Sequence, residues 1–171
     1  SSPGTAMELF SPQRSDVYFG CIGSPSIGLH VRSDQGGSGH HNDFNVKMDS
    51  PDVGVKVGDS SDSQFADRSM YRGQIDNAQS IGVWVAKGKD NEFWTQPENI
   101  PSSGVAYRID NESNIIHRFH SGDGSINGDV FDIRAKRTQI ESPSRDLLTP
   151  SKDNLGKMFV RPDNINAANF H

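Results

Sequence analysis

Carboxylate side chains recur in the polar segments of this chain. Four of them are candidates for catalysis: Asp59, Asp62, Asp67 and Glu92. Glycoside hydrolysis uses two such groups several ångströms apart, one as acid and the other as base or nucleophile, but no single pair stands out here. Two other interpretations of the same acids stay open. They could ligate calcium, which prefers oxygen ligands, or they could hydrogen-bond the backbone of turns.

Aromatic and cationic side chains occupy equivalent places in successive short segments. Lys56, Trp84 and Arg108 each stand between two apolar neighbours, so in extended strands they point away from the side that those neighbours cover. An exposed indole between two cations is suited to stacking on a sugar ring of an acidic glycan, or to a protein interface, where Trp and Arg are enriched. Burial under a neighbouring loop is the third interpretation. A second set of segments supplies three further candidates for ligand binding: Tyr71, Arg72 and Trp94.

No metal or cofactor site is expected from the remaining residues. His40 and His41 precede Asp43, but adjacent residues of a strand face opposite ways and do not converge on one ion. The sequence contains neither a phosphate-binding glycine loop nor a dinucleotide fingerprint. Its single cysteine, Cys21, excludes an internal disulfide framework.

The elements that must position these residues repeat along the chain. Short segments in which apolar and polar side chains alternate recur every 24 to 28 residues. They are 27–31, 53–57, 81–85, 105–109 and 129–133, with a weaker upstream copy at 6–9. Such alternation is typical of a strand with one buried face. The inward row is expected to contain Leu29, Val55, Val83, Tyr107 and Phe131.

A second apolar element lies between consecutive copies, at Phe44–Met48, Tyr71–Ile75 and Ile115–Phe119. Its counterpart around Phe93 is expected to be less regular, because Pro97 cannot donate to a strand ladder. One such unit cannot bury its own apolar face, whereas stacked units share a core. The recurrence resembles that of the right-handed parallel β-helix (pectate-lyase-like) proteins, of the bacteriophage tailspike and tail-fibre type. The resemblance implies an all-β, right-handed parallel β-helix of about six rungs; an antiparallel β-sandwich is the alternative.

The amino-acid composition argues against several other classes of protein. The 171 residues include 23 Val and Ile but only 5 Leu, so strands are favoured over helices. The formal charge of −5 argues against sequence-independent nucleic-acid binding, which relies on basic residues, and no apolar run is long enough for membrane insertion. We expect a β-helix stack over residues 1–140. Where the repeat fades, we expect a C-terminal cap or inter-subunit docking segment over 141–171.

The resemblance, and the lack of an isolated catalytic constellation, predict a non-enzymatic surface module. We expect it to form part of a phage tail fibre, tailspike or similar adhesin, acting as a rigid spacer and binding host-surface polysaccharide or another virion or surface protein. The expected assembly is a homotrimer on a virion or extracellular surface, with no cofactor. Two alternatives stay open: a polysaccharide hydrolase or lyase that uses the carboxylates, and a structural assembly domain that docks through the Trp84 row.

Overall fold

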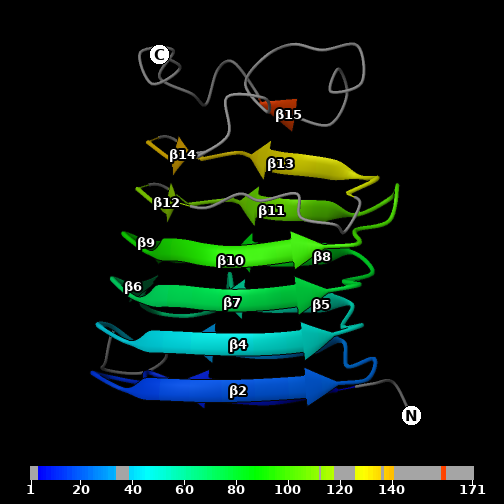
Figure 1. Cartoon of the computed structure of the whole chain (residues 1–171). Helices are drawn as coiled ribbons and strands as arrows, with labels where there is room; N and C mark the ends of the chain where they lie inside the picture. Colours follow the sequence, from blue (N-terminus) through cyan, green and yellow to red (C-terminus); the bar gives the residue numbers. More distant parts are fainter. Residues whose placement is uncertain are drawn as a thin grey trace.

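The structure, a computed structural model, describes residues 4–33, 39–111, 113–117, 126–135 and 137–140, and the backbone of 159–160. Every regular element in these ranges is a β-strand, and the strands pair in parallel with those one turn away (Figure 1). The chain is therefore a parallel β-solenoid of about five turns. This confirms the all-β parallel stack and shows that the antiparallel β-sandwich is wrong; right-handed coiling stays a prediction.

The first sheet is built from the repeated segments. Its seven strands stack in the order β1, β3, β5, β8, β11, β13 and β15. Their respective bounds are Thr5–Phe10, Ile27–Arg32, Val53–Val57, Ile81–Val85, Val105–Ile109, Asp129–Ile133 and Phe159–Val160. Met7 pairs in register with Leu29, and Tyr107 with Phe131. The clear copies of the repeat and the weaker upstream copy therefore align as the sequence predicts.

The second sheet contains six strands, in the order β2, β4, β7, β10, β12 and β14. They span Asp16–Ile22, Asp43–Asp49, Met70–Asp76, Glu92–Glu98, Ile115–Ile116 and Gln139–Ile140. β10 is a full seven-residue strand despite Pro97, so the expected irregularity there is wrong. β12 ends at Ile116, opposite Phe93. Among the described residues, Pro97 therefore has a strand partner on the β7 side only, and a missing N–H is tolerated on an unpaired side.

A third, narrower side closes the turns. β6 (Ala66–Asp67) pairs with β9 (Gly88–Lys89), and single bridges join Gln13 to His40 and His40 to Asp67. Pairings this short leave no periodic pattern, so the sequence did not predict them. Along the chain, a strand of the first sheet is followed by this short contact and then by a strand of the second sheet.

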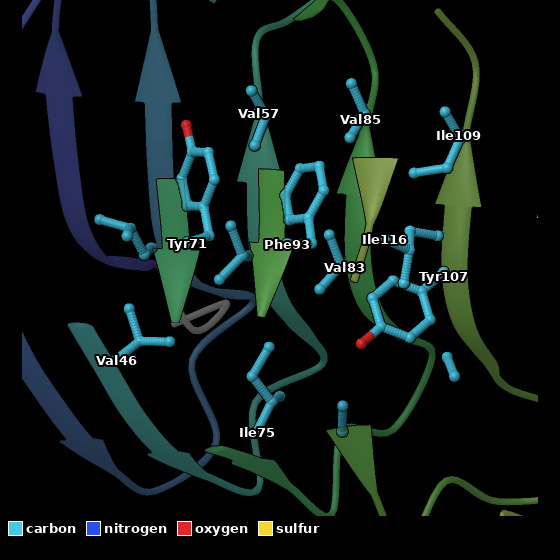
Figure 2. Close-up of a cluster of buried hydrophobic side chains, with 14 of the residues drawn as sticks. Val46, Val57, Tyr71, Ile75, Val83, Val85, Phe93, Tyr107, Ile109 and Ile116 are labelled. Carbon is cyan, nitrogen blue, oxygen red and sulfur yellow. The ribbon is translucent and has the colours of Figure 1, made fainter. Parts of the chain in front are cut away.

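The core lies inside the coil and is filled by the inward side chains of both main sheets. The predicted inward row is buried throughout: Leu29, Val55, Val83, Tyr107 and Phe131. From the second sheet, the Tyr71 ring stacks on Phe44 of the turn before, with centroids 4.9 Å apart. It also stacks on Phe93 of the turn after, with centroids 5.1 Å apart (Figure 2). Burial of each large apolar side chain contributes about 1.5–3 kcal/mol, so contacts between turns hold the column together.

A ladder of small polar side chains leads the chain into each strand of the second sheet after β2. Its buried members directly precede those strands: Asn42, Ser69, Asn91, Asn114 and Thr138. The Asn91 side chain accepts a hydrogen bond from the Ser69 backbone N–H of the preceding turn and donates one to the Ala66 carbonyl. The residue before each member has a left-handed backbone, with φ between 49° and 62°. Sequence analysis missed this corner, which fixes where the second sheet begins.

Close approach between turns explains the glycine near the start of the repeated segments. A Cβ on Gly54 would lie 2.5 Å from the Gly82 carbonyl oxygen and 2.5 Å from Ile75 Cγ2. Two and three turns beyond Gly54, the equivalent residues are Ala106 and Val130. The side chains of the facing sheet that limit the space at Gly54 and at its equivalent Gly82 are Ile75 and Pro97.

The stack runs from Thr5 to Ile140, and β15 continues the first sheet by pairing with β13. Apart from β15, the segment 141–171 that was predicted as a cap or docking segment lies outside the described residues. The described ranges contain no helix that could cross a membrane.

Candidate ligand-binding surface

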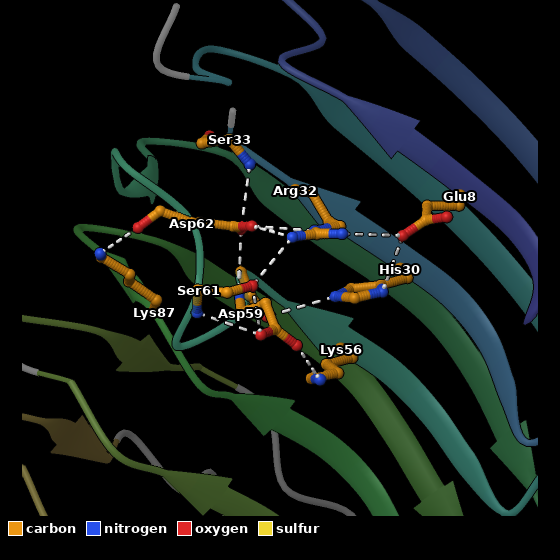
Figure 3. A network of polar contacts seen from close by, with 10 residues as sticks. Glu8, His30, Arg32, Ser33, Lys56, Asp59, Ser61, Asp62 and Lys87 are labelled. Atoms are coloured by element: carbon orange, nitrogen blue, oxygen red, sulfur yellow. Dashed lines mark hydrogen bonds and ion pairs between the residues drawn. The ribbon is translucent and has the colours of Figure 1, made fainter. Parts of the chain in front are cut away.

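The carboxylate of Asp62, predicted as catalytic, is bound into the protein itself. Asp62 is buried in the loop after β5, and its Oδ1 accepts hydrogen bonds from Arg32 Nε and Nη2 at 2.8 and 2.7 Å. Its Oδ2 accepts from the backbone N–H groups of Ser33 and Asp59. Figure 3 shows this network around Asp62. Both oxygens therefore hold the loop against β3.

Asp59 lies three residues earlier in the same loop. Its Oδ2 accepts a hydrogen bond from Lys56 Nζ at 2.5 Å, and its Oδ1 accepts from the Ser61 backbone and hydroxyl. The hydrogen bond from Lys56 lowers the pKa of Asp59 well below its usual range. The group is therefore ionised at neutral pH, whereas a general acid needs a raised pKa.

Asp67 and Glu92 lie on other sides of the solenoid. Asp67 belongs to β6 on the third side and is buried, and its Oδ1 has no hydrogen-bond partner among the described residues. Glu92 begins β10, where its Oε2 is 3.0 Å from His117 Nε2. Of the four candidates, the structure brings only Asp59 and Asp62 together. Within the described ranges, no three His, Cys, Asp or Glu side chains are grouped to hold a metal ion.

Lys56, Trp84 and Arg108 form one row on the outer side of the first sheet. They pair in register on successive turns, as the repeat predicts. Lys56 Nζ lies 4.7 Å, and Arg108 Cζ 4.9 Å, from the centre of the Trp84 ring. The indole N–H donates to Asp110 Oδ2 at 2.7 Å. Because the two cations come from the turns on either side, a sugar ring would stack on Trp84 only by displacing one of them.

The same row continues to His30 and Glu8 on the earlier turns (Figure 3). His30 Nδ1 is 3.4 Å from Glu8 Oε1, and its Nε2 is 3.3 Å from the Gly58 carbonyl oxygen. Burial, and then the positive charge of Lys56, lower the pKa of His30. His30 is 5% and Lys56 9% exposed, so this part of the row offers little surface to a ligand.

The outer side of the second sheet is open by comparison. In Figure 1, β2, β4, β7 and β10 lie in front, and no other described element crosses them. One row of outward side chains runs up this face: Tyr18, Asn45, Arg72, Trp94 and His117. Tyr18 is 84% and Trp94 40% exposed.

Trp94 and Arg72, two of the predicted ligand-binding residues, both lie in this row. The Trp94 ring stacks on the His117 ring with centroids 4.2 Å apart. Arg72 Nη2 is 3.2 Å from Asp43 Oδ2. These contacts orient the two side chains while leaving each partly open to solvent.

Tyr71 is a correction to the predicted set. Its side chain is fully buried in the core, between the rings of Phe44 and Phe93. Adjacent residues of a strand point to opposite sides, so Tyr71 cannot share the surface with Arg72. It stabilises the fold and is not accessible to a ligand.

A groove of about 600 Å³ runs beside the Trp94 row, across β2, β4 and β7. Gly20 leaves it open because this residue has no side chain. Its lining combines the polar side chains of Lys47, Asp49, Gln74 and Asp76 with the apolar ones of Cys21, Ile22 and Met48. Sequence analysis missed the groove, because these residues become neighbours only through the register of the second sheet.

Together these groups place a flat aromatic side chain beside carboxylate, amide and guanidinium groups. Carboxylate and amide oxygens accept hydrogen bonds from hydroxyl groups, while amide and guanidinium N–H groups donate them. The face therefore suits a hydroxyl-rich ligand. Comparisons of the chain with protein-family models, curated proteins and solved structures find no match.

Proposed function

We propose that this chain is a non-enzymatic β-solenoid surface module that binds a glycan on the outer side of β2, β4, β7 and β10. The observation that carries the proposal is the exposed indole of Trp94, next to a groove on the neighbouring strands that is lined by charged, amide and apolar side chains, on a face that no other described element crosses. A Trp side chain combines a large apolar ring with a polar N–H. Such a group can contact the apolar side of a sugar while its neighbours bind the hydroxyl groups.

The carboxylates support binding over cleavage. A polysaccharide hydrolase, the alternative function, requires one carboxyl group that holds a proton and a second one nearby. Both oxygens of Asp62 accept hydrogen bonds, from Arg32 of β3 and from the Ser33 backbone, and hydrogen bonding lowers the pKa of Asp59, the opposite of what an acid catalyst needs.

The wider setting is part of the same proposal. A stack of parallel turns makes a stiff column, suited to a rigid spacer or adhesin. By analogy of fold alone, we place the module in a phage tail fibre, tailspike or related protein of a virion or extracellular surface, as a homotrimer. Light scattering should then give three times the 18.7 kDa mass of one chain. A monomeric mass would contradict the proposed homotrimer.

Binding of the full chain to immobilised bacterial surface polysaccharides tests the site. Trp94→Ala is expected to weaken binding at least tenfold, or about 1.4 kcal/mol. The matched control is Phe65→Ala, because Phe65 is 38% exposed but precedes β6 on the third side. No loss in Trp94→Ala, or an equal loss in both variants, contradicts the proposal.

Analysis of the same polysaccharides after incubation tests the enzymatic alternative. We expect neither new reducing ends nor unsaturated products. Cleavage that disappears in Asp59→Asn or Glu92→Gln would replace the binding proposal by a hydrolase or lyase.

A further inference from the structure

The outer side of the second sheet carries a large share of the chain's net negative charge. Alternation places sixteen residues of β2, β4, β7 and β10 on this side, among them six carboxylates and two cations, Lys47 and Arg72. The acids are Asp16, Asp43, Asp49, Asp76, Glu92 and Glu98. Six acids against two cations give this face a formal charge of −4, compared with −5 for the whole chain.

Three of these carboxylates stand in one row along the ends of the strands: Asp49, Asp76 and Glu98. Each accepts a hydrogen bond from a neutral amide, at 2.9, 2.6 and 3.0 Å, with Asn77, Asn99 and Gln74 as the respective donors. The amides orient the carboxylates without compensating their charge. The row therefore presents negative oxygens along one margin of the face.

This distribution of charge discriminates between classes of glycan. A polyanionic chain would meet repulsion along the whole row, whereas hydroxyl groups donate readily to ionised carboxylates. Lys47 lines the groove and Arg72 stands in the Trp94 row. Arg72 pairs in register with Trp94, so a cationic amino sugar stacked on the indole would lie beside a guanidinium group, and Lys47 adds a second cation in the groove.

We infer that this face selects an uncharged, hydroxyl-rich polysaccharide and excludes polyanionic ones. The inference rests on the proposed function and names the ligand class of that site. It differs from the acidic glycan expected at the Trp84 row, whose cations are paired with Asp59 and Asp110. Because equivalent positions recur every ~4.8 Å up the sheet, the ligand is a chain of sugars lying along the solenoid axis.

Calorimetry on the full chain with polysaccharides of known charge tests the inference. Dextran and mannan are the neutral probes, alginate and hyaluronate the anionic ones, and chitosan the cationic one. We expect a neutral probe to bind at least tenfold more tightly than either anionic probe. Its affinity should change less than twofold between about 20 and about 300 mM salt, because no charge pairing is involved.

Two double variants remove equal charge from different places. Asp49→Asn with Asp76→Asn should weaken neutral binding at least fivefold, because the row loses its ionised acceptors. Asp52→Asn with Asp90→Asn should change it less than twofold, since both of these exposed residues lie outside the face.

The outcomes separate the inference from the proposed function. Preference for alginate, hyaluronate or chitosan that is lost in Trp94→Ala would keep the binding site and overturn the ligand class. Equal effects of the two double variants would also overturn the ligand class. Absence of binding to every probe would overturn both.

Discussion

At the scale of single residues, two buried tyrosines provide an internal comparison. The Tyr71 hydroxyl has no hydrogen-bond partner among the described residues, whereas the Tyr107 hydroxyl donates to the Thr95 carbonyl at 2.5 Å. Both tyrosines are labelled in Figure 2. We expect Tyr71→Phe to leave the free energy of unfolding unchanged or raise it by about 1 kcal/mol, and Tyr107→Phe to lower it by about 1–2 kcal/mol. Urea denaturation of both variants measures the difference. A larger loss in Tyr71→Phe would contradict the geometry.

Single residues also show which features the alternation of apolar and polar side chains can predict. It predicted that Val55 faces inward and that Lys56, Trp84 and Arg108 share an outer row, because side chains in a strand alternate strictly. It did not predict that Asp59 and Asp110 neutralise this row, since both acids approach from loops whose path follows no period. Whether an outward side chain is free or paired is decided by such loops.

At the scale of elements, the corner ladder makes the sharpest prediction. Asn91→Ala removes the acceptor for the Ser69 N–H and the donor to the Ala66 carbonyl, all in a buried setting. Since each unpaired buried group costs about 1–3 kcal/mol, we expect the free energy of unfolding to fall by about 2–4 kcal/mol. Asn45→Ala, at an exposed position of β4, should change it by less than about 0.5 kcal/mol. Equal effects in thermal or urea denaturation would show that the ladder is dispensable.

The ladder also explains why one sheet was easier to predict than the other. The first sheet repeats both its spacing and its side-chain pattern, so its register could be derived from the sequence. The corner varies among Asn, Ser and Thr, and the contacts on the third side are only two residues long. A signal was nevertheless present, because a small polar residue directly precedes β4, β7, β10, β12 and β14.

At the scale of the whole molecule, the candidate site is formed by residues from several stacked turns, and no single segment of the sequence contains it. Asp49, Asp76 and Glu98 are separated by 27 and 22 residues, an irregular spacing that hides their common row. The polar loops between strands absorb this difference in length, so only the register of β4, β7 and β10 brings the three carboxylates together. The charge of the face could not be predicted from the sequence for this reason.

A stack in which each turn contacts only its neighbours should lose structure from its less buried end. The inward side chains of the first turn, among them Leu9 and Phe19, are only partly buried, whereas Val55 and Val83 are fully buried. We therefore expect backbone amides of β5, β7 and β8 to exchange with solvent at least about tenfold more slowly than those of β1 and β2. Hydrogen–deuterium exchange with mass spectrometry at neutral pH measures this gradient. Uniform protection would mean that the column unfolds as one unit, and it would contradict the description of the fold as a one-dimensional stack.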